Sequence, residues 1–248
     1  MTAGVAASRR LQSRAAVLGA VVVTAAGVLA GAVGPVSDDA LPWRAMAVAA
    51  GVMALAVSRI APHHPFPRLG PANLLTGART TVVAVLAGVA IGPAVPAVAW
   101  TLVALATLAA AADTFDGPLA RRSGLATTFG ARFDMEVDAL LILVLSVLVW
   151  RSDRAGAWVL LSGLLRYAFI AAGWLAPWMN GELPPSLRRQ AACVAQIAAL
   201  LVALTPAVPR QWAVAVSAAG LAVLGWSFLV DVVWLARRRR DGPAALAG

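Results

Sequence analysis

The chain has 248 residues, of which 61% are hydrophobic and only 12% charged, and its mean hydropathy is +0.83. Soluble domains carry roughly 45–50% apolar and about 25% charged residues, so this excess cannot be enclosed in a soluble core. The same composition excludes a disordered chain. The single cysteine, Cys193, excludes a secreted fold stapled by disulfides.

The formal net charge is +9, and all 20 of the Lys and Arg residues are arginine. A basic chain can bind nucleic acid, but these arginines lie between long apolar runs rather than along one polar surface. We therefore expect them to orient the protein in a lipid bilayer and to contact anionic lipid. No nucleic-acid partner is expected.

The chain contains eight continuous apolar segments, separated by proline, glycine and charged residues. About 20 apolar residues are needed for a helix to cross the ~30 Å hydrocarbon layer, and continuous runs argue against strands, which would alternate. The sequence therefore predicts an all-α, polytopic membrane helix bundle, whose first segment is an uncleaved signal anchor. The predicted spans are 15–34, 43–60, 71–92, 94–112, 135–150, 155–177, 189–206 and 211–236, with the charged stretch 113–134 as one of the separators.

The arginines are distributed unequally between the two sides that this topology defines. With the N-terminus inside, fourteen arginines fall in inner segments and four in outer loops, and Asp38 and Asp39 also fall outside. Because positive residues accumulate on the cytoplasmic side, we expect both termini and the 113–134 stretch to face the cytoplasm. The expected location is a bacterial cytoplasmic membrane.

Four aspartates lie where the fourth and fifth spans meet the inner surface. Asp113 and Asp116 are three residues apart, and Asp134 and Asp138 are four apart, so each pair shares one helical face. Converging carboxylates at a membrane boundary repel one another unless cations neutralise them. Oxygen ligands without nearby histidine or cysteine favour Mg²⁺ or Mn²⁺. The pattern predicts two such ions, a pair suited to diphosphate chemistry.

Small residues accompany these carboxylates. Gly117 and Ala120 leave one face of the first helix nearly bare, and Gly130 does the same on the second. A flat group could then lie against the backbone, while Arg121 could bind phosphate oxygens through its planar guanidinium. The sequence predicts a diphosphate site beside the metal ions, with room for a flat group against the two helices.

The full pattern is Asp113-x2-Asp116-Gly117-x2-Ala120-Arg121-x8-Gly130-x3-Asp134-x3-Asp138. It resembles the signature of the CDP-alcohol phosphatidyltransferase family at every fixed position. The segment from Pro71 to Arg79 also resembles the start of that family's first core helix. The resemblance covers about residues 68–240, so we expect a two-span extension (1–62), a six-helix catalytic core (63–240) and a cytoplasmic tail (241–248).

The resemblance implies transfer of a phosphatidyl or similar group from CDP-diacylglycerol, or a related CDP-linked donor, to a small alcohol, with release of CMP. It assigns metal binding to all four aspartates and the general base to Asp138. The residues that it implies for CDP binding are Asn73, Thr76, Asp113, Gly117, Ala120, Arg121 and Gly130.

The acceptor alcohol is less well defined. A basic pocket for glycerol 3-phosphate or inositol phosphate could be formed by Arg79, Arg166, Arg188 and Arg189. Arg79 could equally pair with an aspartate, Arg166 could pair with a backbone carbonyl, and Arg188 and Arg189 could serve only as topology markers. Asp231 is expected to pair with an arginine.

Other interpretations remain open at this point. The two extra N-terminal spans could pack within the chain, form a homodimer contact, recruit a partner or admit lipid. A membrane prenyltransferase also uses Mg²⁺ and aspartates, although its two Asp-rich motifs lie on distant helices. A non-catalytic scaffold of the same fold would be expected to have lost an aspartate, and this sequence retains all four.

Overall fold

The computed structural model describes the backbone of residues 2–33, 39–60, 66, 68–93, 99–125, 127–181 and 183–241. Within these ranges it does not describe the side chains of residues 2–10, 99, 115–118, 120, 240 and 241. The described residues form helices and turns without a strand, which confirms the all-α prediction.

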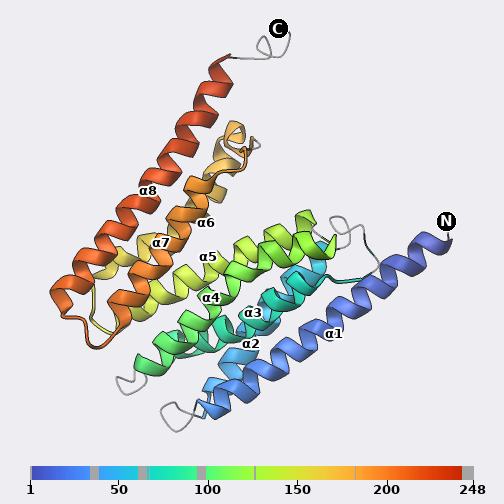
Figure 1. The fold of residues 1–248 in the computed structure, drawn as a ribbon, viewed down its shortest axis with the longest axis horizontal. Coiled ribbons are helices and arrows are strands. Elements are labelled where there is room, and N and C mark those ends of the chain that lie inside the picture. Colours follow the sequence, from blue (N-terminus) through green and yellow to red (C-terminus); the bar gives the residue numbers. More distant parts are fainter. Residues whose placement is uncertain are drawn as a thin grey trace. The chain divides into compact units, whose positions relative to one another are not determined.

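Eight α-helices follow one another in the described chain, close to the eight predicted segments (Figure 1). They are α1 (Thr2–Ala32), α2 (Leu41–Ile60), α3 (Pro71–Ile91), α4 (Ala99–Ser123), α5 (Thr128–Arg151), α6 (Leu161–Leu175), α7 (Leu187–Leu204) and α8 (Arg210–Asp241). Short 3₁₀ turns, η2 (Ala157–Leu160) and η3 (Pro177–Asn180), flank α6.

The charged stretch 113–134, predicted as a separator between spans, is helical over most of its length, as the helical faces predicted for Asp113 and Asp134 require. Helix α4 continues to Ser123 and α5 begins at Thr128, so four residues separate them. Polar side chains can point away from a helix without disturbing its backbone hydrogen bonds. The first residue after α4 is Gly124. That residue has φ of 66°, a left-handed conformation that glycine adopts without steric cost and that commonly ends a helix.

The chain forms two compact units, Met1–Val144 and Leu145–Gly248, which divide within α5. In the first unit α3 is the central helix, because it packs against α1, α2 and α4. In its most apolar stretch of 18 residues, 67% are buried. Small residues allow this crowding, since lipid provides little hydrophobic force between helices and close packing must hold them together.

The two N-terminal helices pack directly on α3. A Cβ atom added to Gly77 would lie 3.3 Å from a Leu18 methyl group, and one added to Gly88 would lie 2.9 Å from a Leu41 methyl group. In addition, the Nε of Arg44 on α2 donates a hydrogen bond to the carbonyl of Gly88 (3.0 Å). Of the roles considered for this extension, packing within the chain is therefore present in the structure.

The second unit is built on the antiparallel pair α7 and α8, with α6 against α8. The contact contains buried polar side chains, including Gln196 on α7 and Ser217 on α8. Gly220 makes room for the first of these, because a Cβ atom there would lie 2.8 Å from the Gln196 carboxamide oxygen.

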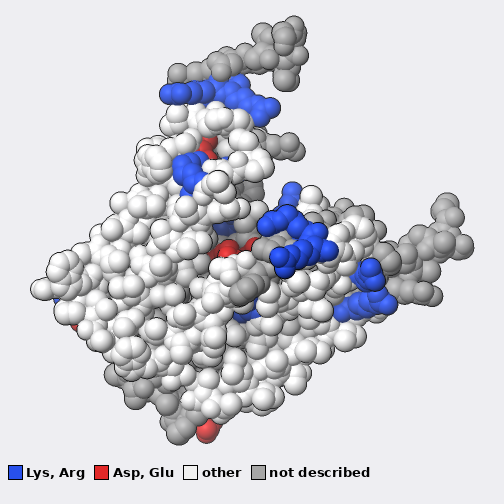
Figure 2. Space-filling model, in the orientation of Figure 1, with Lys and Arg blue, Asp and Glu red and all other residues white. Residues whose placement is uncertain are grey.

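Six of the described helical segments are long and apolar enough to cross a membrane: those of α1, α2, α3, α6 with η2, α7 and α8. Large apolar side chains are exposed along them, among them Leu175 (90%) and Leu187 (82%). Uncharged residues cover most of the face in Figure 2. The chain is a polytopic helical membrane protein, and α4 and α5, which carry the aspartates, are the two helices outside this set.

In the first unit, exposed arginines gather at one end of the helices. The ends of α2 and α4 and the starts of α3 and α5 lie together (Figure 1). They carry Arg59, Arg68, Arg121, Arg122 and Arg132, all exposed. The second unit also has arginines at both ends, with Arg210 paired to Asp153 at one and Arg188 to Asp231 at the other.

Candidate metal centre and active site

The candidate site lies in the first unit, where α4 ends and α5 begins. Thr127 caps α5, because its hydroxyl accepts a hydrogen bond from the backbone N–H of Gly130 (3.0 Å) and satisfies one of the free donors of the first turn. The cap fixes the residue at which α5 begins, and with it the side chains that α5 turns towards α4. Asp113 on α4 and Asp134 and Asp138 on α5 consequently face one another.

Asp113, Asp134 and Asp138 form a cluster of carboxylates. One oxygen atom from each lies within 4.8 Å of the others, and their side chains are 25%, 30% and 17% exposed. This donor set consists of hard oxygen ligands that remain accessible. Such a set fits a divalent cation of the Mg²⁺ or Mn²⁺ type, and the structure thus brings together three of the four predicted metal ligands.

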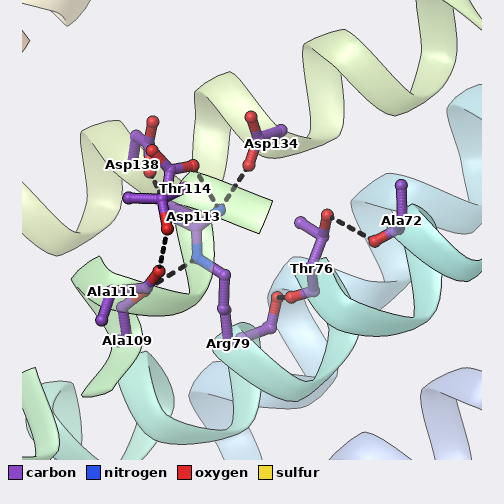
Figure 3. Close-up of polar contacts among 10 residues, drawn as sticks. Ala72, Thr76, Arg79, Ala109, Ala111, Asp113, Thr114, Asp134 and Asp138 are labelled. Atoms are coloured by element: carbon purple, nitrogen blue, oxygen red, sulfur yellow. Dashed lines mark hydrogen bonds and ion pairs between the residues drawn. The ribbon is translucent and has the colours of Figure 1, made fainter. Parts of the chain in front are cut away.

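An arginine from a third helix lies among these carboxylates (Figure 3). Arg79 on α3 is 1% exposed and forms ion pairs with Asp113 (Nη1–Oδ1, 2.9 Å), Asp134 and Asp138. Its Nε donates a hydrogen bond to the carbonyl of Ala109 on α4 (3.1 Å). The alternative that Arg79 pairs with an aspartate is confirmed, and it does so with three of them.

The polar face of α3 continues from Arg79 towards the start of the helix. Asn73 and Thr76 are 3% and 2% exposed. The Thr76 hydroxyl donates to the carbonyl of Ala72 (3.0 Å), which satisfies it within the helix. Gly130 of α5 lies against Asn73: a Cβ atom at Gly130 would be 2.8 Å from the Asn73 Oδ1. The absent side chain of Gly130 therefore permits the close approach of α3 and α5 beside the cluster.

The other predicted donor-binding residues lie on α4. The backbone of Asp116, Gly117 and Ala120 is helical, but their side chains are outside what the structure describes. Arg121, the residue after Ala120, is exposed. The roles predicted for these four residues remain predictions.

Three of the candidate acceptor residues lie in the second unit. Arg166 is half-buried on α6. Arg188 forms an ion pair with Asp231 and donates to the carbonyl and the hydroxyl of Ser227 (hydroxyl, 2.7 Å), while Arg189 pairs with Asp231 at 3.3 Å. The predicted pairing of Asp231 is confirmed.

One arginine has a structural role that the sequence did not indicate. Arg154, counted among the outer-loop arginines, donates hydrogen bonds to the carbonyls of Ala203 (2.9 Å), Thr205 (3.0 Å) and Val208. These carbonyls lie at and beyond the end of α7, where the helix leaves acceptors unsatisfied. Nothing in the sequence around Arg154 indicates this contact, because one arginine in a loop forms no pattern.

The role of Arg79 could have been found from the spacing on α3. Asn73, Thr76 and Arg79 recur every three residues, which places them on one helical face. Together with Thr80 they make a polar strip on a span that is otherwise apolar or small, and all four are buried. Buried polar residues in a membrane helix face protein partners or a functional site.

The sequence model of the CDP-alcohol phosphatidyltransferase family matches residues 70–230, from the N-cap of α3 to the last third of α8. The match includes the cluster, Arg79 and the polar face of α3, and it leaves α1 and α2 outside. No curated protein and no solved structure matches the chain. The family consists of divalent-metal-dependent transferases that move a phosphatidyl group from a CDP-linked donor to an alcohol. With most of its length matched, the chain belongs to the CDP-alcohol phosphatidyltransferase family.

Proposed function

We propose that this protein transfers a phosphatidyl group from CDP-diacylglycerol, or a closely related CDP-linked lipid, to a small phosphate-bearing alcohol such as glycerol 3-phosphate or inositol phosphate. The reaction releases CMP and belongs to phospholipid synthesis. The observation that carries the proposal is the cluster of Asp113, Asp134 and Asp138 on two adjoining helices, which lies inside the stretch that matches the family. We assign metal binding to these aspartates from the resemblance of the sequence pattern.

The aspartates would hold two Mg²⁺ or Mn²⁺ ions, with Asp116 as the fourth ligand. When bound, these ions neutralise the donor diphosphate and stabilise charge on the attacking and leaving oxygens. The carboxylate-only donor set supports this choice of metal.

In the proposed reaction the acceptor hydroxyl oxygen attacks the β-phosphorus of the donor. The bond between that phosphorus and the oxygen of the CMP phosphate breaks, and the electron pair leaves with CMP. Asp138 accepts the hydroxyl proton as general base. Its side chain is the least exposed of the three clustered aspartates (17%), yet it remains partly accessible, as a base that meets a soluble acceptor must be.

The donor would bind along the end of α4 and the start of α5. Gly117, Ala120 and Gly130 allow the nucleotide to approach the backbone, and Arg121, exposed at the helix end, binds phosphate oxygens. Asn73 and Thr76 complete the pocket from α3. The exposed arginines at this end of the first unit support a cytoplasmic orientation of the site.

The test is CMP release by the purified protein in detergent or liposomes supplied with CDP-diacylglycerol, Mg²⁺ and one acceptor at a time. Glycerol 3-phosphate, inositol phosphate, inositol and serine form the panel. We expect CMP and a new lipid phosphate to appear in equal amounts with one of the two phosphate-bearing alcohols. Absence of CMP with every acceptor and with other CDP-linked donors would leave the chain as a non-catalytic scaffold.

A further inference from the structure

Arg79 is surrounded by protein oxygens to an unusual degree. All three guanidinium nitrogens are engaged: Nε by the Ala109 carbonyl, Nη1 by Asp113 and Asp134, and Nη2 by Asp138. These partners come from two helices, and Arg79 comes from a third (Figure 3). At 1% exposure, the guanidinium is almost completely removed from solvent.

The ion pairs at this point join three carboxylates to one guanidinium. Partly buried carboxylates of like charge are costly unless a cation lies between them. Arg79 supplies part of that compensation, and a divalent ion bound by the same aspartates would supply the remainder. The arginine and a bound metal ion would therefore bind the same three carboxylates.

Two simpler roles for Arg79 fit less well. As a tether between α3 and α4 it would need only the bond to Ala109, whereas it also forms three ion pairs. As a ligand for an acceptor phosphate it would have to exchange carboxylate partners for the phosphate. The incoming anion would then lie beside three negatively charged side chains, which repel it.

We propose that Arg79 is a positioning residue that acts as the built-in counter-ion of the metal site. It holds the three carboxylates together when they carry no metal. It also competes with the metal ion for these carboxylates, and this competition lowers the affinity of the site for the metal, so that the ion binds reversibly. This inference rests on the proposed function, because it requires that the aspartates bind a divalent cation.

The experiment measures Mn²⁺ binding to the purified protein by electron paramagnetic resonance, together with Tm in EDTA and in Mn²⁺. Arg79→Gln removes the charge and keeps a donor for the Ala109 carbonyl. It should lower Tm in EDTA, since the carboxylates lose their counter-ion, and tighten the Mn²⁺ Kd by at least about tenfold, since a cation at contact distance is gone. The rise in Tm on adding Mn²⁺ should grow accordingly.

Arg79→Lys keeps one charge but cannot span the three carboxylates with a planar fork. We expect a smaller tightening of the Mn²⁺ Kd, about threefold, because the charge is kept and only part of the contact is lost. Arg44→Gln is the matched control, because Arg44 also binds a carbonyl of α3. It should lower Tm equally in EDTA and in Mn²⁺ and leave the Kd unchanged.

An unchanged or weaker Mn²⁺ Kd in Arg79→Gln would overturn the inference, as would equal losses of Tm in EDTA and in Mn²⁺. If Arg79→Gln folds only when purified with Mn²⁺, the metal has replaced the counter-ion and the inference is supported. If it folds in neither condition, the Mn²⁺ Kd of Arg79→Lys is the test: a tighter Kd supports the inference, and an unchanged Kd overturns it. Failure of the unaltered protein to bind Mn²⁺ would instead count against the proposed function itself.

Discussion

Two arginine–aspartate clusters, one in each compact unit, have opposite charge balances. In the first unit one arginine, Arg79, meets three aspartates. In the second unit one aspartate, Asp231, meets two arginines, Arg188 and Arg189. The same pair of residue types therefore leaves an excess of negative charge at one place and of positive charge at the other.

The difference separates two kinds of site. Excess carboxylate on adjoining helices favours a divalent cation, whereas excess guanidinium favours an anion such as a phosphate. Arg188 is further restrained by Ser227 and lies 5.8 Å from the centre of the Trp226 ring. An ion pair alone therefore does not distinguish a candidate metal site from a candidate anion site in this chain; the proportion of carboxylates to guanidinium groups does.

The largest expected effect comes from neutralising the first cluster. Asp113→Asn or Asp134→Asn should lower kcat by about a thousandfold or more, because several kcal/mol of charge stabilisation is lost with the metal. Excess chelator should abolish the activity of the unaltered protein. CMP release with and without EDTA measures both effects.

Two aspartates of the second unit provide the comparison. Asp153→Asn, at an exposed pair with Arg210, should leave kcat unchanged, and Asp231→Asn should leave the dependence on Mg²⁺ concentration unchanged. Full activity of Asp113→Asn, or a loss of Mg²⁺ dependence in Asp231→Asn, would remove the distinction between the clusters.

The next prediction distinguishes the chemical step, measured by kcat, from donor binding, measured by donor KM, at and beside the first cluster. Asp138→Asn should lower kcat by about 10²–10⁴-fold, the range for loss of a general base, with little change in donor KM. Gly117→Leu should instead raise donor KM, since a bulky side chain blocks the approach to the backbone. Steady-state kinetics with varied CDP-diacylglycerol measure both, and near-normal turnover in Asp138→Asn would leave Asp138 as a metal ligand only.

A smaller effect is expected from the positive cluster. Arg188→Gln should raise the KM for a phosphate-bearing acceptor about tenfold, from loss of one charge-assisted hydrogen bond, without changing donor KM. Arg210→Gln, an exposed arginine at the other end of the unit, is the control and should change neither constant. Equal acceptor KM values in both variants would reduce Arg188 to a partner of Asp231.

The smallest effect tests whether both clusters face the cytoplasm. In a Cys193→Ala background, Arg122→Cys and Arg237→Cys introduce thiols at exposed positions near the C-terminal ends of α4 and α8, which the sequence predicts to be inside. Asp39→Cys introduces one before α2, predicted to be outside. In intact cells an impermeant maleimide should label Asp39→Cys several-fold more than the other two, as expected from arginine placement. Similar labelling of all three would contradict the eight-span topology.

Several features of the protein were accessible from the sequence because they depend on local patterns. Apolar runs near the membrane thickness located the helices. The spacing of Asp113, Asp134 and Asp138 placed them on two helical faces, and the structure brings these three together. Helix ends were less accurate, as in the charged stretch after residue 112, because a charge does not by itself end a helix whose backbone bonds are intact.

The remaining features depend on contacts between segments distant in sequence, and only the tertiary structure determined them. The sequence left Arg79 open between an acceptor ligand and an aspartate partner. Its place among three carboxylates follows from how α3, α4 and α5 pack, with Gly130 against Asn73. Arg154 and the packing of α1 and α2 on α3 are of the same kind. A sequence pattern specifies which face of a helix is polar, but the partner of that face is decided by close packing between helices.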